Sequence, residues 1–194
     1  MRARLDRLIS ALGTSRRGLF AFGVLGVLEN SIVPIPTEPL YLPLMATYPR
    51  RAPLMALALL AGCIVAAVLL YVVAAVAQAA LVAPLLAEFG LASLFAEQVA
   101  KVEGNAFLTV LIIGLSPIPF QLGPLAAGVV GVDIPTFLAA VLLSRGVRYL
   151  GLAALAAFAG AQFAALLERH RTGLVVGSAA VGAGTLVVLA TLGV

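Results

Sequence analysis

Long uncharged segments separated by short charged clusters dominate the sequence. A helix needs about 20 apolar residues to cross the hydrocarbon core of a bilayer. The first uncharged segment has 11 residues and would therefore reach only about halfway across. The pattern predicts an all-α integral membrane protein. Its uncharged segments are residues 18–28, 52–87, 104–132, 149–167 and 172–194.

The same tripeptide, Pro-Ile-Pro, interrupts two of the apolar stretches. Proline lacks a backbone N–H and breaks a helix in its interior. Irregular backbone at membrane depth is tolerated only where protein or a water-filled cavity shields it. We therefore predict two re-entrant helical hairpins, at about 18–48 and 106–131, whose breaks meet at one shielded polar cavity. The residues at the breaks are Pro34, Pro36, Pro117 and Pro119.

Basic residues predict the orientation of the first hairpin. Arg16 and Arg17 precede it, and Arg50 and Arg51 follow it. Lys and Arg concentrate in cytoplasmic loops. A hairpin that enters and leaves on the cytoplasmic side satisfies both pairs, whereas the alternative, a single crossing, leaves one pair on the outer side.

Three full crossings complete the predicted topology. Residues 52–77 cross outward, and the net acidic stretch 88–105 lies outside with a short interfacial helix. Residues 135–167 return inward, and residues 172–194 cross outward. The N-terminus is therefore expected in the cytoplasm and the C-terminus outside.

Each hairpin is followed by a crossing helix, and the two units enter from opposite faces. Such inverted-topology repeats are found in many transporters, with the substrate site near the midplane. The predicted fold is an inverted repeat of two re-entrant helical hairpins, each followed by a transmembrane helix, plus a C-terminal transmembrane helix. Its parts are an amphipathic interfacial helix at 1–17 (alternatively a frayed tail), a membrane domain at 18–171 and a C-terminal transmembrane helix at 172–194.

Two further residues predict where the long helices end and begin. Pro84 is expected to end the helix that starts near residue 52. Asp133 is expected to cap the next long helix, because Pro135 follows at a typical first-turn position.

Composition narrows the class of protein. Of 194 residues, 63% are hydrophobic and 10% are charged, against roughly a quarter charged in soluble domains. The net charge of +4 comes from small scattered clusters, which are orientation signals and no nucleic-acid surface. Cys63 is the single cysteine, so we predict no disulfide, no metal site and a packing role for that residue. Classical enzyme motifs are absent, and we expect neither an enzyme nor a cofactor.

Two carboxylates flank the first break. Glu29 and Glu38 lie within an otherwise apolar region, and an intramembrane carboxylate is a functional-site hypothesis by default. Such a group could take up a proton. The alternative is that each carboxylate only binds exposed N–H groups at a half-helix end.

Two arginines lie inside the second long helix. Arg145 and Arg148 are three residues apart and share one helical face. They would meet the glutamates or an anionic group such as phosphate, which arginine binds with two hydrogen bonds. The alternative is that they snorkel to the outer interface. Gln121 adds a neutral polar group near the second break.

These motifs resemble a known family. ENSIVPIPTEPLYLPLMA (29–46) resembles the first signature of the DedA / SNARE-associated Golgi (VTT-domain) family. LSPIPFQLGPLAAGVVGVDIPTFLAAVLLSRGVRY (115–149) resembles the second signature, most closely that of the short YqaA-like bacterial branch. The resemblance covers about residues 18–165 and implies a VTT/DedA-like inverted repeat of re-entrant hairpins.

The resemblance also implies a function. Family members move lipids between leaflets, by scrambling or flipping phospholipids or recycling undecaprenyl phosphate, and some use a proton or cation gradient. The acidic residues and arginines that matter in the family correspond here to Glu29, Glu38, Arg145 and Arg148. This sequence departs from the family in having no arginine around the second break, where Gln121 lies.

We therefore expect a lipid translocator in a bacterial cytoplasmic (inner) membrane. Its partners would be membrane lipids with an anionic phosphate head group, and proton coupling is part of the hypothesis. Two alternatives are a secondary transporter of a small polar solute or ion and a membrane scaffold that transports nothing. Gly173 and Gly177 form a GxxxG pair, a signal for helix packing or for a homo-oligomer; the alternative is a chance match in a chain with 19 glycines.

Overall fold

The computed structural model describes residues 13–31, 37–116, 118–158 and 160. Every regular element in these ranges is a helix, which confirms the all-α prediction for this part of the chain. The helices are α2 (Arg16–Glu29), α3 (Glu38–Thr47), α4 (Ala52–Glu88), α5 (Ala92–Gly104), α6 (Ala106–Leu115), α7 (Leu122–Val130) and the helix Ile134–Phe158.

Two of the described helices are long and apolar enough, by length and composition, to cross a membrane. They are Ala52–Ala77 within α4 and Ile134–Phe158, and both lie in segments predicted to cross. Several predictions fall outside the described residues: most of the helix at 1–17, the end of the crossing at 135–167, the helix at 172–194 with its GxxxG pair, and Pro34, Pro36 and Pro117.

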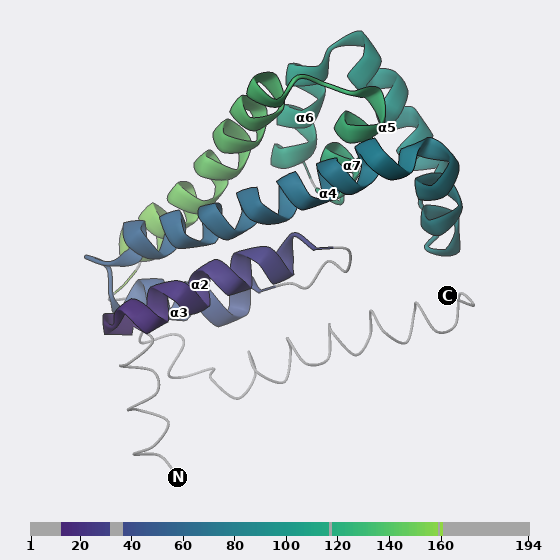
Figure 1. The fold of residues 1–194 in the computed structure, drawn as a ribbon. Helices are drawn as coiled ribbons and strands as arrows, with labels where there is room; N and C mark the ends of the chain where they lie inside the picture. Colours follow the sequence, from purple (N-terminus) through teal and green to yellow (C-terminus); the bar gives the residue numbers. More distant parts are fainter. Residues whose placement is uncertain (1–12, 32–36, 117, 159, 161–194) are drawn as a thin grey trace.

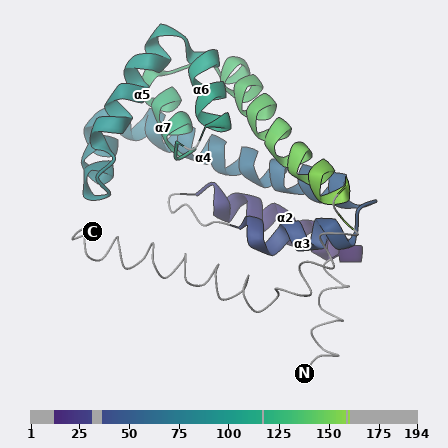
Figure 2. The same ribbon diagram turned by 180° about the vertical axis from the view of Figure 1, so that it is seen from behind.

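Both predicted breaks fall between short helices. Residues 30–37 separate α2 from α3, and residues 116–121 separate α6 from α7. Each pair of short helices is followed by a long helix. In Figures 1 and 2, α4 runs across the molecule, with α2 and α3 on one side and α6 and the 134–158 helix on the other.

Glycines allow α4 to approach its neighbours at backbone distance. A Cβ atom at Gly62 of α4 would collide with the carbonyl oxygen of Gly23, and one at Gly26 would collide with the carbonyl oxygen of Leu59. On the other side of α4, a Cβ atom at Gly128 of α7 would meet the carbonyl oxygen of Tyr71. Close approach through small residues is a principal means of packing helices in membranes, and here it ties both broken pairs to α4.

The prediction that Pro84 ends its helix is wrong, because α4 continues through Pro84 to Glu88. A proline within a helix removes one hydrogen bond and bends the helix without necessarily ending it, and the C-terminal part of α4 turns away from its first part in Figure 1. Beyond Glu88 and the C-cap Phe89, Gly90 has a left-handed φ of 67°, and Leu91 N–H donates to the carbonyl of Leu86 over 2.9 Å. This bond closes a Schellman-type end.

Three local predictions are confirmed. A short helix, α5, lies within the acidic stretch, and its Phe95 is buried; its interfacial position stays a prediction. Cys63 is fully buried in the apolar core. The Asp133 carboxylate accepts a hydrogen bond of 2.9 Å from the Thr136 N–H at the start of the 134–158 helix.

Because α2 and α4 are in close contact, adding one methyl group between them should destabilise the folded protein. Gly62→Ala should lower the free energy of unfolding by about 1–3 kcal/mol, because the new Cβ has no space. The matched control is Gly151→Ala in the 134–158 helix, where nothing lies within 4 Å of the added Cβ; this change should be neutral or stabilising. Thermal unfolding in detergent compares them, and equal midpoints would contradict the packing described here.

The cap at Asp133 predicts a pH-dependent contribution to stability. The Thr136 N–H binds the ionised carboxylate and lowers the pKa of Asp133 below its usual value. The cap therefore gives its full stabilisation at pH values above the pKa of Asp133 in the unfolded chain, about 3.9. This stabilisation is lost as the pH falls through the lower pKa of Asp133 in the folded protein. Asp133→Ala should lower the thermal midpoint at pH 7, by an amount that shrinks in acid. Asp133→Asn retains an acceptor and should remove the pH dependence; a penalty for Asp133→Ala that is constant with pH would contradict this account.

Candidate functional site

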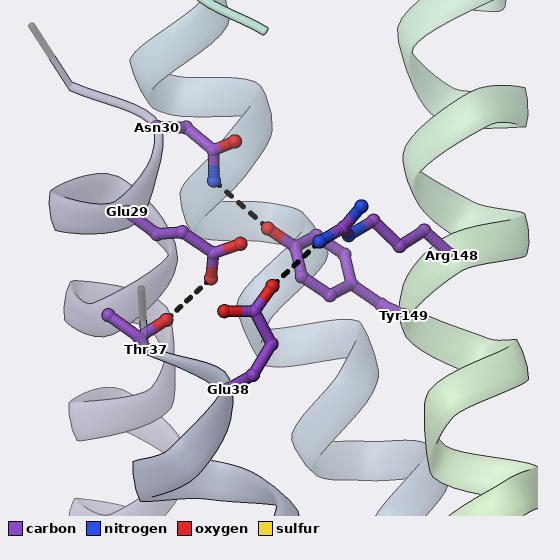
Figure 3. Close-up of polar contacts among 6 residues, drawn as sticks. All are labelled: Glu29, Asn30, Thr37, Glu38, Arg148 and Tyr149. Carbon is purple, nitrogen blue, oxygen red and sulfur yellow. Dashed lines mark hydrogen bonds and ion pairs between the residues drawn. The ribbon is translucent and has the colours of Figure 1, made fainter. Parts of the chain in front are cut away.

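The charged residues predicted from the sequence gather where four helices meet. Glu29 is the last residue of α2 and Glu38 is the first residue of α3, while Arg148 lies on the 134–158 helix. Figure 3 shows the two carboxylates and the Arg148 guanidinium pointing into the same space, with α4 alongside. Residues 110 positions apart thus share one polar cluster.

Arg148 and Glu38 form an ion pair. Arg148 Nη2 donates to Glu38 Oε1 over 2.6 Å, and the two side chains are 37% and 27% exposed. Glu38 also lies in the first turn of α3, where the helix dipole favours a carboxylate. This hydrogen bond agrees with the expectation that the arginines meet the glutamates.

Glu29 has a different environment. It accepts a 2.6 Å hydrogen bond at Oε2 from the Thr37 hydroxyl, which joins the two sides of the first break. The C-terminal end of α2, where Glu29 lies, presents carbonyl groups and the negative end of the helix dipole. Among the described residues, the partner of the Glu29 carboxylate is the hydroxyl of Thr37, the residue before α3.

Asn30 links the first break to the long helix of the second unit. Its Nδ2 donates to the carbonyl of Gly26 over 2.8 Å and to the Tyr149 hydroxyl over 2.9 Å, as Figure 3 shows for the second bond. Asn30 and Tyr149 are both buried. Sequence reasoning missed Tyr149; the available signal was a polar aromatic residue directly after Arg148, on the helix expected to face the break.

Arg145 is a buried cation that forms no ion pair with the described residues, although the charge of Glu29 acts on it. It is 6% exposed, and its guanidinium carbon lies 3.9 Å from the centre of the Phe120 ring. Its Nε is buried and has no hydrogen-bond partner in the described part of the chain. A guanidinium over an aromatic face gains a cation–π attraction, but an anion would satisfy it better. Burial under Phe120, which sequence reasoning also missed, argues against snorkelling for this residue.

Gln121 brings the two breaks into contact. Its Nε2 donates to the carbonyl oxygen of Ser31 over 2.9 Å, across 90 residues of sequence. A backbone carbonyl released by the first break is thereby bound by a side chain from the second. The expectation that the two breaks meet agrees with this contact.

The cluster contains two carboxylates and two guanidinium groups. Glu29 lies near enough to Glu38, Arg145 and Arg148 for their charges to act on one another. Arg148 forms an ion pair with Glu38, whereas Arg145 forms no ion pair with the described residues. Among the described residues, no group of three His, Cys, Asp or Glu side chains could hold a metal ion.

Comparisons with known proteins add one relative. An uncharacterized protein of Haemophilus influenzae is 28% identical to this chain over 154 residues, which cover 79% of this chain and 80% of the relative. No protein-family profile matches the chain, and no solved structure matches it. The similarity therefore extends over most of both chains.

The ion pair predicts a measurable coupling between Arg148 and Glu38. In a double-mutant cycle of Arg148→Gln and Glu38→Gln, we expect about 1 kcal/mol of coupling in the free energy of unfolding, because the pair is half-buried. The matched control is the pair of Lys101 and Glu97, 2.5 Å apart with both side chains 54% exposed, for which about 0.3–0.5 kcal/mol is expected.

Chemical or thermal unfolding of the four proteins of each cycle in detergent gives both values. A coupling at Arg148 and Glu38 no larger than that at the exposed pair would contradict the view that this ion pair organises the site.

Proposed function

We propose that this protein moves lipids with anionic phosphate head groups between the leaflets of a bacterial cytoplasmic membrane, as a protein of the DedA / SNARE-associated Golgi (VTT-domain) type. In this proposal the two broken helix pairs are re-entrant hairpins that enter from opposite faces. The N-terminus lies in the cytoplasm and the C-terminus outside. The lipid head group passes through the polar cluster while its acyl chains stay in the bilayer.

The observation that carries the proposal is the buried side chain of Arg145, which forms no ion pair with the described residues and whose Nε has no hydrogen-bond partner among them. Leaving an ionised group buried without a partner costs several kcal/mol, and a residue with that cost has a function to serve. A phosphate would supply the missing hydrogen bonds in a bidentate arrangement. We therefore assign the first contact with the phosphate to Arg145.

Arg148 has a second role in this scheme. It is held by Glu38 over 2.6 Å, so a phosphate that also contacts Arg148 must replace that carboxylate. The carboxylate of Glu38, released in this exchange, would then lack its partner. We keep proton coupling as part of the proposal, since two carboxylates, Glu29 and Glu38, lie beside this arginine.

The surfaces of the long helices fit a lipid environment. Large apolar side chains are exposed along α4 and along the 134–158 helix, where lipid tails would cover them. Polar groups are instead collected at the breaks, where irregular backbone requires shielding. The exposed apolar residues include Leu57, Val65, Leu69, Val72, Val73, Val76, Leu142, Val147, Leu155 and Phe158.

Leaflet exchange in proteoliposomes tests this proposal. Wild-type protein should speed the exchange of a fluorescent phospholipid above that of protein-free vesicles, and Arg145→Gln should slow it by about tenfold or more, because a charge-assisted hydrogen bond is lost. The matched control is Arg50→Gln, since Arg50 is an exposed arginine outside the helices, and this change should leave the rate unaltered.

A panel of phospholipids and a polyprenyl phosphate, run with and without a pH gradient, covers the proposed substrates. Wild-type protein that exchanges none of them would overturn the proposal. Uptake of a small anion by the same vesicles would then favour a solute transporter, and unaltered behaviour of Arg145→Gln in every assay would favour a scaffold.

A further inference from the structure

Phe120 and Gln121 are adjacent in sequence and act on two different parts of the site. Phe120 is 4% exposed, and its ring covers the Arg145 guanidinium at 3.9 Å. Gln121 is 7% exposed and donates to the carbonyl of Ser31 over 2.9 Å. One dipeptide therefore covers the Arg145 cation and is also bound to the opposite break.

We propose that Phe120 and Gln121 form a gate over Arg145. Gln121 is the latch that holds the second break against the first, and Phe120 is the cover that keeps Arg145 from the ligand. The inference rests on the proposed function in one respect only, namely that Arg145 contacts the ligand. Phe120 and Gln121 are not among the charged residues that would bind the ligand.

The backbone couples the latch to the cover. Leu122 N–H donates to the carbonyl of Pro119 over 3.1 Å, and Gly123 N–H donates to the carbonyl of Phe120 over 2.9 Å. These bonds make the dipeptide part of one hydrogen-bonded turn at the start of α7. A movement that separates Gln121 from Ser31 therefore moves Phe120 as well.

The other end of α7 is fixed. Gly128 lies at backbone distance from Tyr71 and Ala74 of α4, so α7 cannot shift as a whole without disturbing that contact. We place the opening at the first turn of α7, where the attachment to the described part of the first break is the neutral hydrogen bond between Gln121 and Ser31. A neutral hydrogen bond is weaker than the charge-assisted bond between Arg148 and Glu38, so the latch yields before the ion pair does.

The aromatic ring of Phe120 gives Arg145 a contact that an incoming anion can replace. In the closed arrangement the Phe120 ring gives Arg145 a cation–π contact that offsets part of its burial. An anion that reaches Arg145 replaces this contact with stronger charge-assisted hydrogen bonds. The cation is thus partly compensated in the closed arrangement and better compensated when the ligand is bound.

Thiol labelling tests the latch without any lipid assay. In a Cys63→Ala background, Arg145→Cys places one thiol beneath the gate, and a small water-soluble maleimide reports access to it in proteoliposomes. Adding Gln121→Leu should speed labelling by about fivefold, the factor expected for losing one hydrogen bond of ordinary strength. The matched control is Gln98→Leu, which changes a buried glutamine of α5 whose Nε2 has no partner among the described residues; it should leave the labelling rate unaltered.

Equal labelling rates with Gln121→Leu and Gln98→Leu would overturn the gate. Phe120→Leu provides a second variant that keeps an apolar side chain of smaller area, and it should also speed labelling; slower or unaltered labelling with this variant would contradict the cover. Both variants must elute from size exclusion as the parent protein does.

The lipid assay then separates the two proposals. With Arg145 intact, Gln121→Leu should raise the rate of leaflet exchange above that of wild type and of Gln98→Leu. Faster labelling with no lipid exchange by wild-type protein would leave the gate in place and remove the proposed function. If lipid exchange depends on Arg145 but the labelling rate is the same with and without Gln121→Leu, the proposed function stands and the gate is overturned.

Discussion

Charge inside an apolar helical protein must be compensated, and this constraint organises the centre of the molecule. Two arginines one helical turn apart lie on the 134–158 helix, within an otherwise apolar stretch. Arg148 is compensated by Glu38. Arg145 forms no ion pair with the described residues; it contacts the Phe120 ring, and the charge of Glu29 acts on it. The two arginines of this helix are therefore compensated in different ways.

The breaks in the helices supply the remaining polar groups. A broken helix leaves carbonyl and N–H groups that an apolar surrounding does not satisfy. Here the carbonyl of Ser31 is bound by Gln121, the amide of Asn30 by Tyr149 and Gly26, and the carboxylate of Glu29 by Thr37. Each break is therefore held partly by groups from elsewhere in the chain, and the polar cluster depends on the two halves being together.

The long helix α4 holds the two broken helix pairs together. It contacts α2 through Gly62 and α7 through Gly128, at backbone distance in both cases. At the contact with α2 the glycine belongs to α4 (Gly62), and at the contact with α7 it belongs to α7 (Gly128); neither position has room for a larger residue. The same helix exposes large apolar side chains elsewhere. It is thus both the frame for the site and one of the two helices suited by length and composition to cross a membrane.

The sequence by itself determined the helical class, the positions of the two breaks, the cap at Asp133 and the charged residues of the cluster. Each of these depends on local chemistry: apolar length, proline's missing N–H, and the rarity of charge in an apolar stretch. Only the tertiary structure decided that Glu38 and not Glu29 pairs with Arg148, that Tyr149 binds Asn30, and that Phe120 covers Arg145. These contacts join residues about 25 to 120 positions apart, and no periodicity along the chain specifies which side chains meet when separate helices pack. The passage of α4 through Pro84 was likewise decided by structure, because a proline can bend a helix or end it, and the left-handed Gly90 lies just beyond the actual end.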